Sequence, residues 1–242
     1  MDKNKYLVGL IGLAIGFIIS FFWTQSINKN NATTGVAASS MPSGASGGGG
    51  QQAMMGQVQQ VLERAKNSPN DFQAQIDAAK VFNQVGRKAE TVEYLKKAYD
   101  VNAVEFVRQS STDLQGVLPF LAFYYDDQKN YDESDKWIRR ALDAAPNDSE
   151  MRIEFASAYL QRQPPQLDKA IQELLAELKV NPKDGHALGH LVEAYALKKD
   201  ARSAEETVKR LKETDPTNQR ISVLETLVAD LKAGKAVTIP KE

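Results

Sequence analysis

The sequence contains no cysteine among its 242 residues. This absence excludes disulfides, thiol catalysis, thiolate metal sites and lipid attachment through cysteine. The chain also lacks an excess of either charge, because 30 Lys and Arg residues against 31 Asp and Glu give a formal net charge of −1. Proteins that bind nucleic acid usually carry a clear basic excess, so we predict no nucleic-acid partner.

Histidine is also scarce. The two histidines, His186 and His190, stand four residues apart, and Glu193 follows three residues later. On a helix these side chains lie near one face, where they could share a metal ion. The zinc-protease signature, however, requires glutamate directly after the first histidine, and Ala187 stands there. The polar face of a helix explains the same residues, so we predict no metal ion and no other cofactor.

Motifs for catalysis are lacking as well. The glycine run at 47–50 has no following Lys-Ser pair, as a phosphate-binding loop requires. With both histidines in one short segment, no plausible Ser-His-Asp triad arises. Carboxylates elsewhere are interpreted as solvated helix faces, and we predict that the protein is not an enzyme. These carboxylates include Asp126, Asp127, Glu205 and Glu206.

A stretch without charge runs from Tyr6 to Trp23. At 1.5 Å per residue its length is roughly 27 Å, close to the thickness of a bilayer's hydrocarbon core. The alternative is a cleaved signal peptide, whose apolar core is shorter and is followed closely by a small-residue cleavage site. We predict an N-terminal membrane anchor over residues 1–29, with a transmembrane helix at about 6–23.

The charges beside this span predict its orientation. Lys3 and Lys5 precede the span, whereas Lys29 is the near cation that follows it. Lys and Arg tend to stay in the cytoplasm. We therefore expect a single-pass inner membrane protein with a cytoplasmic N-terminus and the rest in the periplasm, or otherwise extracytoplasmic.

Small residues recur every four positions within the span. They form a stripe on which two helices could pack closely and self-associate weakly, although glycine is also simply common in membrane helices. The stripe consists of Gly12, Gly16 and Ser20.

After the span the chain changes character twice. Residues 30–52 are uncharged and rich in Gly, Ser and Ala, which is typical of a flexible linker. Four segments of 34 or 36 residues then align with one another. Apolar residues recur at spacings of three and four in both halves of each segment, which predicts two helices per segment. The segments are 72–105, 115–148, 149–184 and 185–218.

Each segment carries the same order of core positions. A small or short residue stands at position eight, an aromatic at eleven, a small residue at twenty and a larger apolar one four residues later. The small residues let two helices approach closely, and the aromatic fills the remaining gap. A proline, which lacks the amide donor, ends three of the segments. In the third segment these residues are Ala156, Tyr159, Ala170, Leu174 and Pro182.

This period and order resemble the tetratricopeptide repeat family. The resemblance implies an all-α solenoid whose first helices line a concave groove that takes a protein or a peptide. The family's usual tryptophan at position four is replaced by Gln75, Leu118, Arg152 and Leu188. We interpret 53–71 as a partial capping repeat, 219–234 as a C-terminal capping helix and 235–242 as a tail.

The family's groove positions carry a mixed set of residues here. The basic clamp that holds chaperone carboxylate tails in some members is absent. The resemblance predicts that the partner-binding groove is lined by Gln73, Ile76, Lys80, Phe120, Phe123, Asp126, Ile153, Ser157, His186, His190 and Glu193.

Our leading functional hypothesis is a membrane-anchored scaffold. It would bind a protein or peptide partner in its groove and assemble or organise a complex at the membrane. An alternative comes from a resemblance in architecture to cytochrome c maturation factors, which hold apocytochrome for haem ligation behind a membrane helix.

Phe120 and Phe123 give a first test of the predicted groove. Tyr125 already occupies the core position, and exposed aromatics are typical binding anchors. Replacing both phenylalanines with alanine should weaken partner capture in a co-purification and leave the thermal unfolding temperature unchanged. A large loss of thermal stability would instead favour packing against the 106–114 connector or a neighbouring helix.

Overall fold

The computed structural model describes residues 49–239, with side chains from residue 55 onward. This part of the chain forms eleven α-helices and no strand. The predicted all-α class with paired helices is confirmed for these residues.

The predicted membrane anchor lies outside the described residues. This holds for the transmembrane helix at 6–23, for the stripe of Gly12, Gly16 and Ser20, and for most of the predicted linker. Within residues 49–239, no helix is both long and apolar enough to cross a bilayer.

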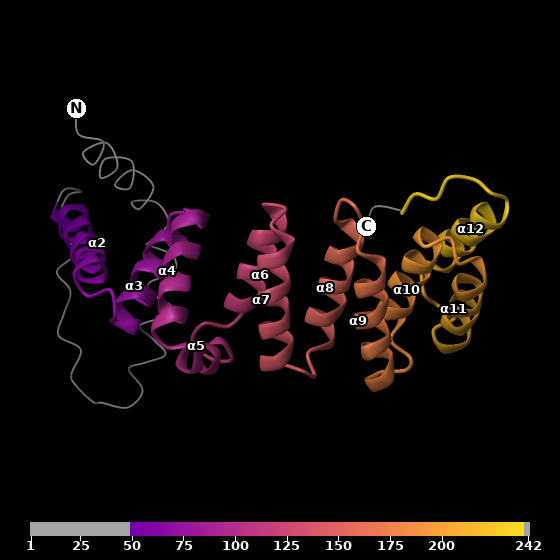
Figure 1. Cartoon of the computed structure of the whole chain (residues 1–242), viewed down its shortest axis with the longest axis horizontal. Coiled ribbons are helices and arrows are strands. Elements are labelled where there is room, and N and C mark those ends of the chain that lie inside the picture. The colour runs from indigo at the N-terminus through magenta and orange to yellow at the C-terminus, as the bar shows by residue number, and fades with distance from the viewer. Residues whose placement is uncertain (1–48, 240–242) are drawn as a thin grey trace, which may run out of the picture. The chain divides into compact units, whose positions relative to one another are not determined.

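The chain divides into two compact units between Gln109 and Ser110. In the first unit, α3 packs against both α2 and α4. A short further helix, α5, ends at the division (Figure 1). The bounds are α2 Gly49–Asn67, α3 Phe72–Gln84, α4 Lys88–Val101 and α5 Ala103–Ser110.

The second unit contains three helix pairs and a closing helix (Figure 1). Within each pair the two helices pack against each other along the chain order α6–α7, α8–α9 and α10–α11. The last helix, α12, packs against α10 and α11. The bounds are α6 Val117–Asp127, α7 Tyr131–Ala144, α8 Ser149–Gln161, α9 Leu167–Val180, α10 Gly185–Leu197, α11 Ala201–Thr214 and α12 Ile221–Lys232.

Short polar side chains begin many of these helices. The carboxylate of Asp148 accepts a hydrogen bond from the backbone N–H of Met151 at 3.0 Å, and that of Asp184 accepts one from Ala187 at 2.8 Å. Such caps satisfy amide groups that a helix N-terminus leaves without an intrahelical partner. The same arrangement begins α3, α7 and α11, through Asp71, Asn130 and Asp200.

Small residues hold the two helices of each pair together, as the repeat pattern predicts. The residues at positions eight and twenty are at most 3% exposed in all four pairs. Without large side chains between them, the two backbones can approach closely and exclude water. These residues are Ala79 with Thr91, Ala122 with Ser134, Ala156 with Ala170, and Val192 with Ala204.

The aromatic position behaves less uniformly than the sequence pattern suggests. Phe82 and Tyr159 are buried, but Tyr125 and Tyr195 remain partly exposed. The ring of Tyr125 lies edge-on to that of Tyr124, with centroids 5.4 Å apart. The aromatic therefore fills the gap fully in two of the four pairs.

Two predicted boundaries need correction at the N-terminal side. Helix α2 begins at Gly49, inside the range expected to be linker. Helix α5 occupies much of the expected 106–114 connector. It forms because Asn102 caps it through the N–H of Glu105, and because the buried ring of Phe106 packs edge-on to Tyr99, with centroids 5.6 Å apart.

The closing helix α12 covers the last pair with a narrower face than expected. Leu224, Leu227 and Val228 are buried, whereas Val223 is 45% exposed. Gly234 follows with φ +73°, the left-handed conformation that commonly ends a helix.

A buried arginine joins the second and third pairs. The side chain of Arg162, directly after α8, is 0% exposed. Its Nε donates to Asp126 Oδ1 at 2.7 Å, its Nη1 to Asp135 Oδ1 at 2.7 Å, and its Nη2 to Ser134 Oγ at 2.9 Å. Asp126 lies in the last turn of α6, while Ser134 and Asp135 lie on α7, so one side chain ties three helices together.

The surroundings of Arg162 favour its charge. The guanidinium lies 4.6 Å from the ring centroid of Tyr131 and 4.5 Å from that of Tyr159. Burial alone would raise the pKa of Asp135, but hydrogen bonds from Lys169 and Arg162 outweigh it and leave that pKa lowered. The buried guanidinium is therefore paired with two carboxylates, as a charge removed from water requires.

Replacing Arg162 with alanine should lower the free energy of unfolding by about 3–5 kcal/mol, because buried carboxylates lose their partner. Urea unfolding of the full chain measures this. The matched control is Arg202→Ala, whose side chain is 88% exposed and pairs with Glu206. That change should leave the free energy of unfolding nearly unchanged, because exposed ion pairs contribute little to stability. Equal effects of the two substitutions would contradict the account.

Candidate functional site

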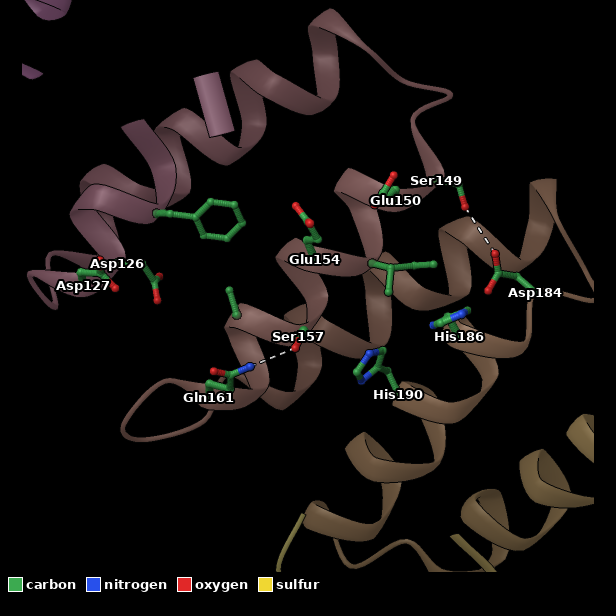
Figure 2. A pocket seen from close by; sticks show the side chains of 13 residues that line it. Asp126, Asp127, Ser149, Glu150, Glu154, Ser157, Gln161, Asp184, His186 and His190 are labelled. Carbon is green, nitrogen blue, oxygen red and sulfur yellow. Dashed lines mark hydrogen bonds between the residues drawn. The ribbon is translucent and has the colours of Figure 1, made fainter. Parts of the chain in front are cut away.

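A groove of about 760 Å³ opens in the second unit along the first helices of the three pairs. We call it the α6–α8–α10 groove. Figure 2 shows side chains from these helices directed into one hollow. It is lined by Phe123, Asp126, Asp127, Ser149, Glu150, Ile153, Glu154, Ser157, Ala158, Gln161, Asp184, His186 and His190.

Six of the eleven predicted groove residues line this groove together. They come from three helices that lie far apart in the sequence. The six are Phe123, Asp126, Ile153, Ser157, His186 and His190. Three others, Gln73, Ile76 and Lys80, belong to the first unit. The remaining two, Phe120 and Glu193, lie in the second unit but do not line the groove.

Ile76 does not fit a groove position, because its side chain is fully buried. Helix α3 packs against α2 on one side and α4 on the other, so little of its surface is free. Gln75, on the same helix, is also buried, and its Nε2 donates a hydrogen bond to the carbonyl of Ala65 in α2 at 2.9 Å. Gln73 and Lys80 remain exposed.

The two phenylalanines separate in the structure. The ring of Phe123 lines the groove and also packs against the ring of Phe155 in α8, with centroids 5.4 Å apart. Phe120 is partly buried and outside the groove lining. Phe123 therefore fits both alternatives, because its ring packs against a neighbouring helix and also faces the groove.

Glu193 is the clearest correction to the predicted groove. Its side chain is 2% exposed, and its carboxylate binds Arg220 at the start of α12. The side chain of Glu193 is buried because α12 covers that face of α10. Gly189 leaves room for this contact, since a Cβ there would lie 3.0 Å from Arg220 Nη1.

His190 lies between the groove and this buried carboxylate. Its side chain is 8% exposed, and its Nδ1 lies 2.9 Å from Glu193 Oε2. His186 is exposed at the groove. The three residues expected on one polar face thus have three different environments. Among residues 49–239, no cluster of three or more His, Asp or Glu side chains is arranged to hold a metal ion.

Asp126 also departs from the expectation of a solvated carboxylate. Its side chain is 18% exposed and is bound by Arg162. The repeat pattern does not indicate this contact, because the two residues stand 36 positions apart, beyond one repeat. Asp127, beside it, is exposed as predicted.

Several groove residues were not predicted. Glu150 and Asp184 add carboxylates at the starts of α8 and α10, and Gln161 ends α8 with its Nε2 donating to Ser157 Oγ at 3.0 Å. Helix starts attract acidic residues. The sequence could therefore have indicated Glu150 and Asp184 through their place at the beginning of each pair.

The groove concentrates negative charge. Burial raises the pKa of Glu154, and the neighbouring carboxylates Glu150 and Asp148 raise it further. An ionised Glu154 is therefore poorly compensated by the protein around it.

The helix pairs are similar to those of known proteins. Residues 120–148, which cover most of α6 and α7, match the family model of the tetratricopeptide repeat. The fold is similar to that of YrrB, described as a TPR protein with an unusual peptide-binding site. The TM-score is 0.50 and the identity 16%, over 74% of this chain and 90% of that chain. The fold is that of a tetratricopeptide-repeat protein.

A second similar structure is that of MamA, with a TM-score of 0.47 and 15% identity, over 71% of this chain and 97% of that chain. No curated protein matches the chain in sequence. Each helix pair corresponds to one tetratricopeptide repeat, and the α6–α8–α10 groove lies along the first helices of three successive repeats.

Replacing Glu193 with alanine should destabilise the chain by about 2–4 kcal/mol, because Arg220 and His190 lose a buried carboxylate. Replacing His186 with alanine should change the free energy of unfolding by no more than about 0.5 kcal/mol, because this side chain is exposed. Urea unfolding measures both. Similar losses in the two variants would show that the histidines and Glu193 share one environment after all.

Proposed function

We propose that this chain is a scaffold that binds a segment of another protein in the α6–α8–α10 groove. The groove supports the proposal most directly, because its volume of about 760 Å³ comes from three helices arranged along one face. Binding sites in proteins are commonly concave and have volumes of roughly 300–1,000 Å³. The peptide-binding site described for YrrB is compatible with such use of the fold.

The chemistry of the lining suits a polypeptide. Phe123, Ile153 and Ala158 offer apolar contacts, while Ser157 and Gln161 offer hydrogen-bonding groups. Interfaces that bind proteins combine an apolar centre with a polar rim in this way. Either a helix laid in the groove or an extended segment would use these contacts.

The groove is also preorganised. Its α6 side is held to α7 and α8 through the buried Arg162, and its α10 side is held to α12 through Glu193 and Arg220. A rigid site loses less conformational entropy when it binds, so more of the contact energy contributes to affinity.

Residues 1–29 provide the proposed connection to a membrane. The uncharged stretch at 6–23 supports an anchor, and Lys3 and Lys5 before it support a cytoplasmic N-terminus with the repeats on the outer face of the inner membrane. The chain would then organise its partner at the membrane surface. Weak self-association through Gly12, Gly16 and Ser20 stays a prediction, as does the assignment as a non-enzyme.

The cytochrome c maturation alternative also stays a prediction. It shares the anchor and the repeats with the proposed scaffold and would use the groove in the same way. The residues that line the groove do not favour apocytochrome over another polypeptide.

Photo-crosslinking in native membranes tests the groove. A benzophenone amino acid at Ser157, inside the groove, should crosslink the full-length chain to a defined partner. The same amino acid at Ser222, exposed on α12, serves as the position control. Equal crosslinking to one protein from both positions would contradict a groove-specific site.

A blocking substitution completes this test. Ser157→Arg should reduce co-purification of that partner by about tenfold, which corresponds to about 1.4 kcal/mol. Ser222→Arg, which adds the same side chain on α12, should leave co-purification unchanged. Both variants should keep the wild-type thermal unfolding temperature. Full retention of the partner by Ser157→Arg would overturn the proposed function.

A further inference from the structure

We infer that the α6–α8–α10 groove selects a basic partner segment, an extended stretch in which lysine or arginine side chains stand beside apolar ones. This inference rests on the proposed function and names the class of partner. The basic partner class is supported by two hollows that share one acidic wall and by the distribution of charge along them.

The negative charge of the groove is a local feature. Five carboxylates line it, from Asp126, Asp127, Glu150, Glu154 and Asp184, and no Lys or Arg does. The whole chain carries a formal net charge of only −1, so composition alone does not explain this concentration. A surface hollow with one sign of charge attracts ligands of the opposite sign.

The carboxylates are spread along the groove. Figure 2 shows Asp126 and Asp127 on one side, Asp184 with His186 on the opposite side, and Glu150 and Glu154 between them. They come from the end of α6, the start of α8 and the start of α10. A partner that satisfies them must therefore present several cationic groups along its length.

Three of these carboxylates are available to a partner. Asp126 is neutralised by Arg162, and Asp184 accepts hydrogen bonds from the Ala187 N–H at 2.8 Å and from Ser149 Oγ at 3.4 Å. By contrast, Asp127, Glu150 and Glu154 form no ion pair with any described residue. The raised pKa of Glu154 agrees with this, because burial and the carboxylates of Glu150 and Asp148 all disfavour its ionised form.

A second hollow adjoins the first and offers apolar contacts to a partner. It has a volume of about 450 Å³ and lies between α6, α7 and α8; we call it the α6–α7–α8 pocket. Leu118, Pro119 and Met151 line it, and so do Glu150 and Glu154, which also line the groove. An apolar side chain in this pocket would place its neighbours in an extended segment next to the two glutamates.

A single metal ion does not fit this arrangement. Within residues 49–239, no group of three or more acidic or histidine side chains could hold one ion. Phosphate-rich partners such as nucleic acid would be repelled by the carboxylates. Lysine and arginine can reach separate carboxylates from one backbone, and arginine can bind a carboxylate through two parallel hydrogen bonds.

A peptide array tests the inference. The purified full-length chain is incubated with immobilised random decapeptides that span net charges from acidic to basic. Peptides that bind should be enriched in Lys and Arg and should contain apolar residues beside them. Their binding should weaken when NaCl is raised from about 50 mM to about 300 mM, because salt screens exposed charges. Binding without a Lys or Arg preference, or no binding at all, would overturn the inference.

Charge variants locate the effect. Glu150→Gln with Glu154→Gln removes two charges from the wall that the two hollows share and should weaken the best basic peptide by about fivefold. Glu205→Gln with Glu206→Gln is the matched control, because it removes the same charge from the exposed face of α11, outside both hollows. That control should stay within about twofold of wild type. An equal loss in the two double variants would show a nonspecific charge effect and overturn the inference.

The array and the crosslinking separate two kinds of failure. A partner that crosslinks at Ser157 and is lost in Ser157→Arg, but is insensitive to both Glu→Gln changes, would retain the scaffold function and reject the basic partner class. Loss of crosslinking at Ser157 would reject the function itself.

Discussion

Close packing between the two helices of each pair is the constraint on which the rest of the structure depends. At positions eight and twenty every pair has a short side chain that is at most 3% exposed. A larger side chain at either position would push the helices apart and open the interior. With each pair closely packed, the first helices stand along one face of the second unit and leave a groove between them.

The link between the second and third pairs is chemically different from the packing within a pair. Here a fully buried guanidinium, that of Arg162, binds Asp126 and Asp135 and lies between two tyrosine rings. The contact fixes Asp126 at the edge of the groove and neutralises it. It therefore shapes both the geometry of the α6–α8–α10 groove and the pattern of charge that remains available inside it.

The period of the sequence predicted most of the fold, because helix pairing depends on residues within one repeat. The caps, the small residues and the closing prolines are all local signals of this kind. Contacts between repeats were not predictable in the same way. The third segment is two residues longer than the other three, and Arg162 lies beside this insertion. A 34-residue pattern does not indicate which residues an insertion will contact.

The candidate site shows the same division. Positions such as Ile153 and Ser157 line the groove as the family pattern suggests, since only their own helix decides where they point. Ile76 and Glu193 do not, because Ile76 is fully buried within the first unit and α12 covers the face of α10 that carries Glu193. The acidic character of the groove was also missed. Glu150 occupies position two of the third segment, as His186 does in the fourth, whereas Asp184 precedes the fourth segment and lies outside the family's groove positions.

Hydrogen–deuterium exchange of the full chain, with and without its bound partner segment, tests whether the partner lies in the α6–α8–α10 groove. A partner bound in the groove should give new protection at the C-terminal end of α6, in α8 and at the N-terminal half of α10, with α7, α9 and α11 unchanged. Protection confined to the second helices, or to the unit that ends at Gln109, would show that the partner binds another surface and would contradict the account.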